Sequence, residues 1–349
     1  MPSGRATVRE VAAATGVSIA TVSRVLNQQG SVAPETRALV ERAVEELGLR
    51  APSPRGGTPK PVAGAVYVRC PYLLTDYFGL IVSSIAESLD RHGRQVILNA
   101  GQGVAGEPVL SRLASGRRPP AAVGPAGEPD LAGAILILPP ESADELLRLR
   151  ERRLPFVVVD PRTPLPRDIA SVSAAHFSGA RQVSAHLAEL GHRRIGVIAG
   201  PREWLASEAR LSGHAAALAD AGSLPDPSLV RYVEPTTEEG YRAAGDLLDL
   251  PQRPTALVAF NDKVAVGALQ AAAQRGLRVP PDLSIAGFDD IDVSRATSPM
   301  LTTVRQPLQE MGRMAVSLLI RLLDRHEVEA LHVELATELV VRDSTGPAS

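Results

Sequence analysis

The residue types best suited to hold a small polar molecule stand where short apolar runs end. Asp160 follows Phe-Val-Val-Val, Asn261 follows Leu-Val-Ala-Phe, and Asp289 follows Ser-Ile-Ala-Gly-Phe. Carboxylate and amide groups make directional hydrogen bonds to hydroxyls, and Arg210, near the start of a predicted helix, adds a charged donor. An aromatic face can cover the apolar side of a sugar ring. Three aromatic residues stand at comparable positions: Tyr77, Phe78 and Trp204.

An alternation of short β-branched runs and amphipathic helices positions these residues. The predicted strands are 62–68, 96–98, 134–138, 156–159, 195–198, 257–260 and 283–286. The predicted helices are 78–92, 174–190, 206–221, 237–248 and 262–275. This alternation is typical of parallel sheets with helices on both faces, and its length predicts two lobes. Because ligands bind beyond the carboxyl ends of such strands, we expect one small-molecule site where these ends meet.

Each polar residue taken singly also has a structural interpretation, since Asp262 could cap its helix and Asp290 could form a salt bridge. An enzyme that uses Asp289 and Asp290 as paired acid and base is a rival hypothesis. Adjacent residues, however, point in divergent directions, and the sequence has no nucleophile elbow, metal-ligand cluster, P-loop or Gly-rich dinucleotide motif. We therefore expect a binding protein without catalytic activity, metal or cofactor.

The first fifty residues predict three short helices. Thr7 to Glu10 read as a capping box, Gly16 supplies a turn, Ser18 caps a second helix, and Pro34 opens a third. Two helices joined by a Gly-containing turn and braced by a third are typical of a helix-turn-helix. The alternative is a small helical subdomain with a solvated polar face. In the helix-turn-helix layout, the outward-facing residues of the second helix are Ser18, Ile19, Ala20, Thr21, Ser23 and Arg24.

The string Gly-Val-Ser-Ile-Ala-Thr-Val-Ser-Arg-Val-Leu-Asn at 16–27, near the start of the chain, closely resembles the DNA-binding head of the lactose/galactose repressor (LacI/GalR) family. The resemblance implies that Ile19 and Ala20 read base edges in the major groove. It further implies supporting phosphate or base contacts from the rest of this surface. The full set of expected DNA-binding residues is Thr7, Ser18, Ile19, Ala20, Thr21, Ser23, Arg24, Asn27 and Arg55.

The resemblance continues through the larger domain, in strings such as Glu-Leu-Gly-His-Arg-Arg-Ile-Gly-Val-Ile-Ala-Gly-Pro at 189–201 and Arg-Pro-Thr-Ala-Leu-Val-Ala-Phe-Asn-Asp at 253–262. It implies an effector-binding core similar to periplasmic sugar-binding proteins, with Asp289 and Arg210 as the principal sugar contacts. Two departures stand out. The family's Asp-Asn pair is replaced by Ala175-His176, and no aromatic residue stands near Pro235. His176 is either a polar contact to the effector or a helix-start residue.

Residues 51–61 depart from the family's hinge helix. Four prolines and a Gly-Gly pair disfavour a helix there, and no apolar residue stands where the family inserts a wedge into the minor groove. We expect a semi-extended linker with Arg50, Arg55 and Lys60 available to phosphates, and an operator that is kinked little. An ordinary interdomain spacer is an equal alternative.

The composition fits a soluble protein of a reducing compartment. Hydrophobic residues make up 44% and charged residues 22%, the only cysteine is Cys70, and no long apolar run suggests an export signal or membrane span. A secreted sugar-binding protein would need such a signal and would not use the first fifty residues. Although the net charge is −2, residues 1–60 hold eight basic against five acidic side chains, which suits a DNA-contacting head. We expect a cytoplasmic location.

The family resemblance implies a homodimer whose heads straddle a pseudo-palindromic operator, with a small-molecule effector bound between the lobes. The chemistry of the expected pocket residues favours a sugar or sugar derivative as that effector. The expected division is a helix-turn-helix domain at 1–50, a Pro/Gly-rich linker at 51–61, a two-lobed effector-binding and dimerisation domain at 62–341 and a tail at 342–349. The family pattern also implies three chain crossings between the lobes. Residues near 291–322 are expected to return to the first lobe and a final strand at 332–341 to the second.

Overall fold

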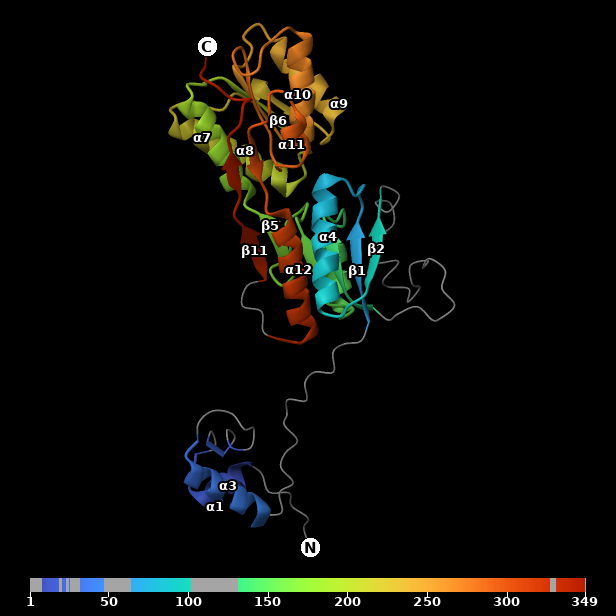
Figure 1. Cartoon of the computed structure of the whole chain (residues 1–349), viewed down its shortest axis with the longest axis vertical. Helices are drawn as coiled ribbons and strands as arrows, with labels where there is room; N and C mark the ends of the chain where they lie inside the picture. The colour runs from blue at the N-terminus through green and yellow to red at the C-terminus, as the bar shows by residue number, and fades with distance from the viewer. Residues whose placement is uncertain are drawn as a thin grey trace, which may run out of the picture. The chain divides into compact units, whose positions relative to one another are not determined.

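The computed structural model describes residues 8–18, 21–22, 25, 32–46, 64–101, 131–326 and 331–348. The chain divides into two compact units, Met1–Val62 and Ala63–Ser349, which are considered separately (Figure 1).

The first unit is a small helical head. It contains α1 (Val8–Thr15) and α3 (Pro34–Glu46), and residues 21, 22 and 25 are also helical. Gly16 has a φ of +69°, as its predicted turn requires, because an L side chain rarely adopts that conformation. Valines from the described parts of all three predicted helices form a buried core: Val11, Val22, Val25, Val40 and Val44. The described parts of the three predicted helices therefore share one apolar core.

The first lobe of the larger unit is built on a six-stranded parallel sheet in the order β11-β5-β4-β3-β1-β2. Its strands are β1 (Ala65–Cys70), β2 (Val96–Ala100), β3 (Leu131–Ile137), β4 (Phe156–Val159), β5 (Ala170–Ala174) and β11 (His332–Leu335). Its helices are α4 (Asp76–Arg91), α6 (Ala143–Glu151) and α12 (Leu308–Leu323). Helices α4 and α12 pack together over one face of this sheet (Figure 1). Helix α6 packs on the other face.

The second lobe has a four-stranded parallel sheet in the order β7-β6-β8-β9 and a two-stranded antiparallel pair, β10 and β12. Its strands are β6 (Ile195–Ala199), β7 (Val230–Tyr232), β8 (Ala256–Ala259), β9 (Ser284–Ala286), β10 (Thr303–Arg305) and β12 (Glu338–Val340). Its helices are α7 (His176–Glu189), α8 (Leu205–Asp220), α9 (Thr237–Leu248), α10 (Asp262–Gln274), α11 (Val293–Ala296) and the short η2 (Pro227–Leu229). The pair α7 and α8 and the pair α9 and α10 each bury a separate core against the sheet.

The expected fold class is confirmed, and the chain crosses between the lobes three times as predicted. Two of the expected boundaries are wrong. Residues 291–305 stay in the second lobe, and the return to the first lobe begins only with α12. The predicted final strand is two strands, because β11 pairs with β5 of the first lobe whereas β12 pairs with β10 of the second. No Gly or Pro marks the break at Ala336-Thr337, so local sequence carries no signal for it.

Residues beyond β12 pack against the second lobe. Ser344 is fully buried, its hydroxyl bonds to the carbonyl of Ile285, and it accepts a bond from the N–H of Thr302. The N–H of Ala348 also donates to the carbonyl of Leu190. The expected tail is thus part of the second lobe up to Ala348. Among the described helices, none combines the length and apolar character that a membrane crossing needs.

Candidate functional site

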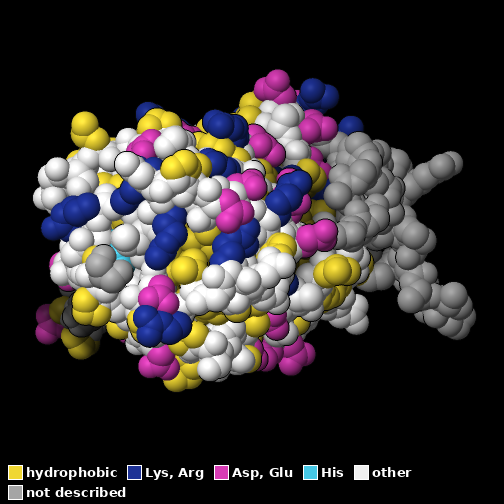
Figure 2. Space-filling view, turned by 90° about the horizontal axis from the view of Figure 1, so that it is seen from above, with side chains coloured by type: hydrophobic (Ala, Val, Ile, Leu, Met, Phe, Trp, Pro, Cys, Tyr) yellow, Lys and Arg dark blue, Asp and Glu magenta, His cyan; other side chains and the backbone are white. Residues whose placement is uncertain are grey.

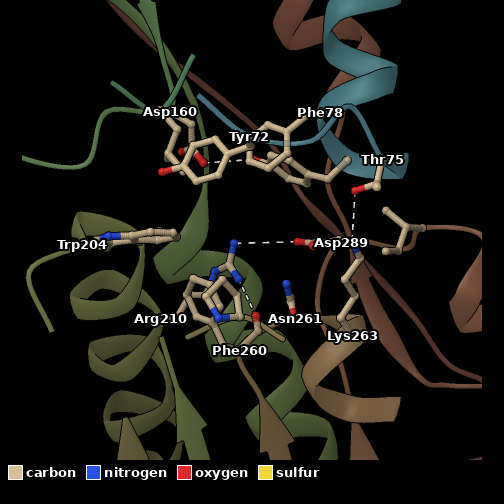
Figure 3. Close-up of a pocket in the computed structure, with 15 residues that line it drawn as sticks. Tyr72, Thr75, Phe78, Asp160, Trp204, Arg210, Phe260, Asn261, Lys263 and Asp289 are labelled. Atoms are coloured by element: carbon tan, nitrogen blue, oxygen red, sulfur yellow. Dashed lines mark hydrogen bonds and ion pairs between the residues drawn. The ribbon is translucent and has the colours of Figure 1, made fainter. Parts of the chain in front are cut away.

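A pocket lies between the two lobes, where the carboxyl ends of strands from both sheets face each other (Figure 3). It encloses about 650 Å³ of empty space, part of it open to solvent. The first lobe contributes Tyr72, Thr75, Tyr77, Phe78, Leu138 and Asp160. The second lobe contributes Trp204, Ala206, Arg210, Pro235, Phe260, Asn261, Lys263, Asp289 and Ile291. The structure thereby brings together every residue expected to bind the effector except His176.

Arg210 is the buried cation of this pocket. It projects from α8, is 5% exposed, and donates to the backbone carbonyl of Phe260. Its guanidinium lies 3.9 Å from Asp289 and stacks over Phe288 at 3.7 Å and Phe260 at 4.4 Å. A buried charge is tolerated only when it is paired and bonded in this way. Its Nε is buried and has no hydrogen-bond partner in the described structure.

Asp160 is held ionised at the end of β4. The Tyr77 hydroxyl donates to its Oδ2 at 2.9 Å, and the Nε2 of His176 lies 2.7 Å from its Oδ1. Burial by itself would raise the pKa of Asp160, but His176, Arg210 and Tyr77 together lower that pKa below its usual value. Burial, followed by the nearby carboxylate of Asp160, raises the pKa of Tyr77 well above its usual value. Tyr77 therefore stays a donor and Asp160 an acceptor near neutral pH.

Asp289 behaves differently, although it is equally buried. Burial raises the pKa of its carboxyl to about 7, while Arg210 and the hydrogen bond from Gln306 act in the opposite direction. The Gln306 amide donates to Oδ1 at 2.6 Å. The backbone of Asp289 has a φ of +117°, a conformation that L residues rarely adopt. Such strain at a pocket residue is common where a side chain must be aimed at a ligand.

Asn261 and Lys263 stand at the start of α10. The side-chain oxygen of Asn261 caps the helix by accepting from the N–H of Val264 at 3.0 Å, so its amide nitrogen faces the pocket (Figure 3). The Lys263 ammonium donates to the Thr75 hydroxyl at 3.0 Å. Since Thr75 precedes α4 of the first lobe, this bond joins the two lobes across the pocket.

Aromatic rings form the apolar walls. Tyr72 stacks on Phe78 with ring centroids 4.6 Å apart and planes 4° from parallel. On the opposite lobe, Trp204 meets Phe260 edge to face at 6.1 Å. The Arg162 guanidinium lies 5.2 Å from the Tyr72 ring centroid and 5.0 Å from that of Trp204, between the lobes. The Tyr72 hydroxyl and the Arg162 Nε are buried without a partner in the described structure. Buried polar atoms are normally hydrogen-bonded, so a water molecule or a ligand is the expected partner of these two.

Sequence reasoning missed several lining residues. Tyr72 and Phe260 follow β1 and β8, so the strand-end rule that selected Asp160 would also have selected them. Lys263 lies two positions beyond Asn261 in the first helical turn. Asp290 forms the salt bridge that the sequence suggested for it: its side chain is 1% exposed and ion-paired with three arginines, Arg295, Arg305 and Arg342. It does not line the pocket.

The predicted DNA-reading surface is described at two positions. Ser18 is exposed, and its hydroxyl accepts from the N–H of Thr21 at 3.1 Å, which is the expected helix cap. The two hydroxyls lie 2.9 Å apart. The other expected DNA contacts lie outside the described residues: Thr7, Ile19, Ala20, Ser23, Arg24, Asn27 and Arg55.

A helical head followed by two α/β lobes with a pocket between them defines a class, the ligand-responsive regulators built on a periplasmic-binding-protein-like domain. Residues 7–50 match the family model of bacterial regulatory proteins, lacI family, and residues 184–345 match that of the periplasmic binding protein-like domain. The chain belongs to the LacI family of transcription regulators.

Curated relatives agree over almost the full length. The transcriptional repressor CytR of Escherichia coli strain K12 is 33% identical over 346 residues, covering 97% of this chain and 96% of the relative. The transcriptional regulator CelR of Thermobifida fusca is 33% identical over 348 residues, covering 97% and 98%. The expected family, fold class and function as a DNA-binding transcription regulator are confirmed.

Solved structures agree as well. A complex of the regulator CelR with cellobiose matches with a TM-score of 0.71 at 31% identity, covering 97% of this chain and 100% of that one. A lac repressor dimer bound to operator and the anti-inducer ONPF matches with a TM-score of 0.69 at 26% identity, covering 98% and 100%.

Proposed function

We propose that this regulator binds operator DNA as a homodimer and that a sugar or sugar derivative, bound between the lobes, changes its operator affinity. The observation that carries this proposal is the composition of the pocket. Arg210 and the Asn261 amide are donors, Asp160 is an acceptor, and the Asp289 carboxyl, whose pKa lies at about 7, can donate or accept. Each sugar hydroxyl both donates and accepts, so this alternation suits a polyhydroxylated ring. The facing aromatic walls suit its C–H surfaces.

The proposed division of labour assigns 1–50 to DNA, 51–61 to a linker, 62–341 to the effector and the dimer, and 342–349 to a terminal segment. Operator contacts would come from the surface around Ser18 and Thr21 together with the expected residues outside the described part. The face of the larger unit in Figure 2 mixes basic and acidic side chains rather than presenting one sign, which favours the head as the DNA-contacting part. The linker residue Arg55 would contact phosphates.

Effector control requires that the sugar bind the DNA-competent and incompetent states with different affinity. Two contacts between the lobes border the pocket: Lys263 with Thr75, and Asp160 with His176. A ligand that touches both lobes competes with or strengthens these contacts, so it favours one relative orientation of the lobes. By reciprocity, operator DNA must change the affinity for the sugar by the same factor.

Self-association is supported by apolar side chains that the first lobe exposes near α4 and on its edge strand β2. Leu73 is 60%, Leu74 42%, Leu80 39% and Leu98 43% exposed. Large apolar side chains exposed in this way favour a protein contact. The structurally similar lac repressor is a dimer on its operator, and a symmetric dimer matches a pseudo-palindromic site.

We further propose a cytoplasmic protein without catalytic activity. Its relatives are transcription regulators. The one carboxylate pair suggested by the sequence, Asp289 and Asp290, does not share a site, because Asp290 is occupied by arginines on the other side of the chain.

Thermal-shift measurements on the purified protein with a panel of sugars and sugar phosphates, including cellobiose and ribose, test the proposal. Sugars that raise the unfolding temperature should then alter operator binding in a gel shift. Asp289→Ala should abolish the sugar response and leave operator affinity intact. Arg24→Ala should weaken operator binding and leave the sugar response intact. If either variant, well folded, loses both functions equally, the proposed division is wrong.

A further inference from the structure

His176 is the expected effector residue that the structure leaves outside the pocket lining. It is the first residue of α7, and it is 7% exposed. Its Nε2 lies 2.7 Å from the Asp160 carboxylate, and its Nδ1 lies 3.2 Å from the Arg210 guanidinium. His176 therefore stands directly behind two pocket residues and joins a carboxylate of the first lobe to a cation of the second.

The partners of His176 determine where its proton lies. A guanidinium has donors only, so the Nδ1 of His176 must accept from Arg210. The single proton of a neutral imidazole is then on Nε2, where it donates to Asp160. This Nε2–H form satisfies both neighbours. A protonated imidazole would instead direct a second N–H at the Arg210 guanidinium, and that bond would be lost.

The other charged groups around His176 act in opposite directions on the protonation of its ring. Asp160 attracts a proton to the ring, whereas Arg210 and the positive end of the α7 helix dipole repel one. Tyr77 donates to Asp160, and Asp289 pairs with Arg210, so both residues act on His176 indirectly. The opposite side of His176 faces a second cavity that includes the exposed carboxylates of two residues, Glu208 and Glu334. The Phe288 ring packs 6.1 Å from the imidazole.

We propose that His176 is a positioning residue of the effector site: its neutral Nε2–H form fixes Asp160 and Arg210 in the arrangement that binds the effector, and protonation of the ring releases that arrangement. The inference rests on the proposed function of the pocket. Because the binding arrangement carries one proton fewer, effector affinity should rise as the pH rises.

Trp204 provides a readout that needs no ligand. It is the only tryptophan of the chain, and it lines the pocket. We expect its fluorescence in the full-length wild-type protein to show a transition between about pH 5 and pH 8. His176→Gln keeps a donor and an acceptor but cannot be protonated, so it should lose the part of the transition that protonation of the His176 ring causes. His176→Ala lacks both groups and should give the low-pH signal at every pH.

Two controls separate His176 from other titrating groups. His92→Gln changes an exposed histidine at the end of α4 and should keep the wild-type transition. Asp289 ionises in the same range, since burial raises its pKa to about 7. The transition lost in His176→Gln should therefore persist in Asp289→Asn. The nearby His214 stays neutral in this window because burial lowers its pKa to about 3.

A wild-type protein without a transition, or a His176→Gln variant that keeps it in full, would overturn the positioning role. Should His176→Gln fail to fold, His176→Asn offers the same neutral donor and acceptor and is judged by the same outcomes. The two overturning results, no transition in the wild type or a full transition in His176→Gln, would leave a sugar-dependent thermal shift unaffected. A panel in which no sugar acts, combined with the expected Trp204 behaviour, would instead defeat the proposed effector class and leave the proton-dependent arrangement standing.

Discussion

Replacing Asp289 by Asn removes a carboxyl group whose surroundings oppose its ionisation. Burial raises the pKa of this group to about 7 in the folded protein, against the pull of Arg210 and Gln306. In an unfolded chain an aspartate titrates at about 3.9. Between these two values, the folded protein holds a proton that the unfolded chain has released. The stabilising contribution is therefore complete below about pH 3.9 and is lost as the pH rises through about 7.

The interval between the two pKa values gives the free energy that ionisation of Asp289 costs the folded protein. At about 1.4 kcal/mol per pH unit, ionising Asp289 in the folded protein costs about 4 kcal/mol. Asp289→Asn has no carboxyl group to titrate. The difference in unfolding free energy, wild type minus Asp289→Asn, should therefore fall by up to about 4 kcal/mol between pH 4 and pH 8. The pH dependence of the groups that do not interact with Asp289 cancels in this difference.

Denaturant unfolding followed by Trp204 fluorescence supplies the measurement, because the chain has no other tryptophan. The two proteins would be compared at pH 4, 5, 6, 7 and 8 and at one protein concentration, since association changes apparent stability. A difference that is constant, or that rises with pH, would refute the reasoning. The Asn variant should also lose the sugar response, which would make Asp289 a residue retained for binding at a cost in stability.

Three further changes have outcomes set by local geometry. Gly267→Ala would place a methyl group 2.1 Å from a backbone oxygen of α9, so we expect its unfolding free energy in denaturant to fall by about 1–3 kcal/mol. In the control Gly79→Ala the nearest atom is 3.5 Å from the new methyl group, and stability should not fall. Ser344→Ala leaves a buried backbone N–H without its partner and should lower unfolding stability by about 1–3 kcal/mol. Lys263→Met breaks the bond between the lobes at Thr75 and should change sugar affinity about tenfold in calorimetric titration, with unfolding stability nearly unchanged.

The sequence by itself determined the local structure and the positions at which a site could form. Helix 237–248 and strand 156–159 are observed with the predicted boundaries. Periodicity, caps and breakers act within one or two turns of chain, so a single sequence displays them. The rule that ligands meet the carboxyl ends of parallel strands then selected Asp160, Asn261 and Asp289, because it depends on strand direction alone.

Only the tertiary structure decided which of these side chains meet and in what state. His176 and Asp160 are 16 residues apart, and His176 and Arg210 are 34 apart, yet one imidazole bridges both. Asp289 and Asp290 are adjacent, yet one faces the pocket and the other is paired with arginines. Such outcomes depend on strand order, on the crossings between lobes and on burial. These are set by contacts between distant segments, and desolvation, which fixes the protonation of Asp289, exists only once those segments have packed.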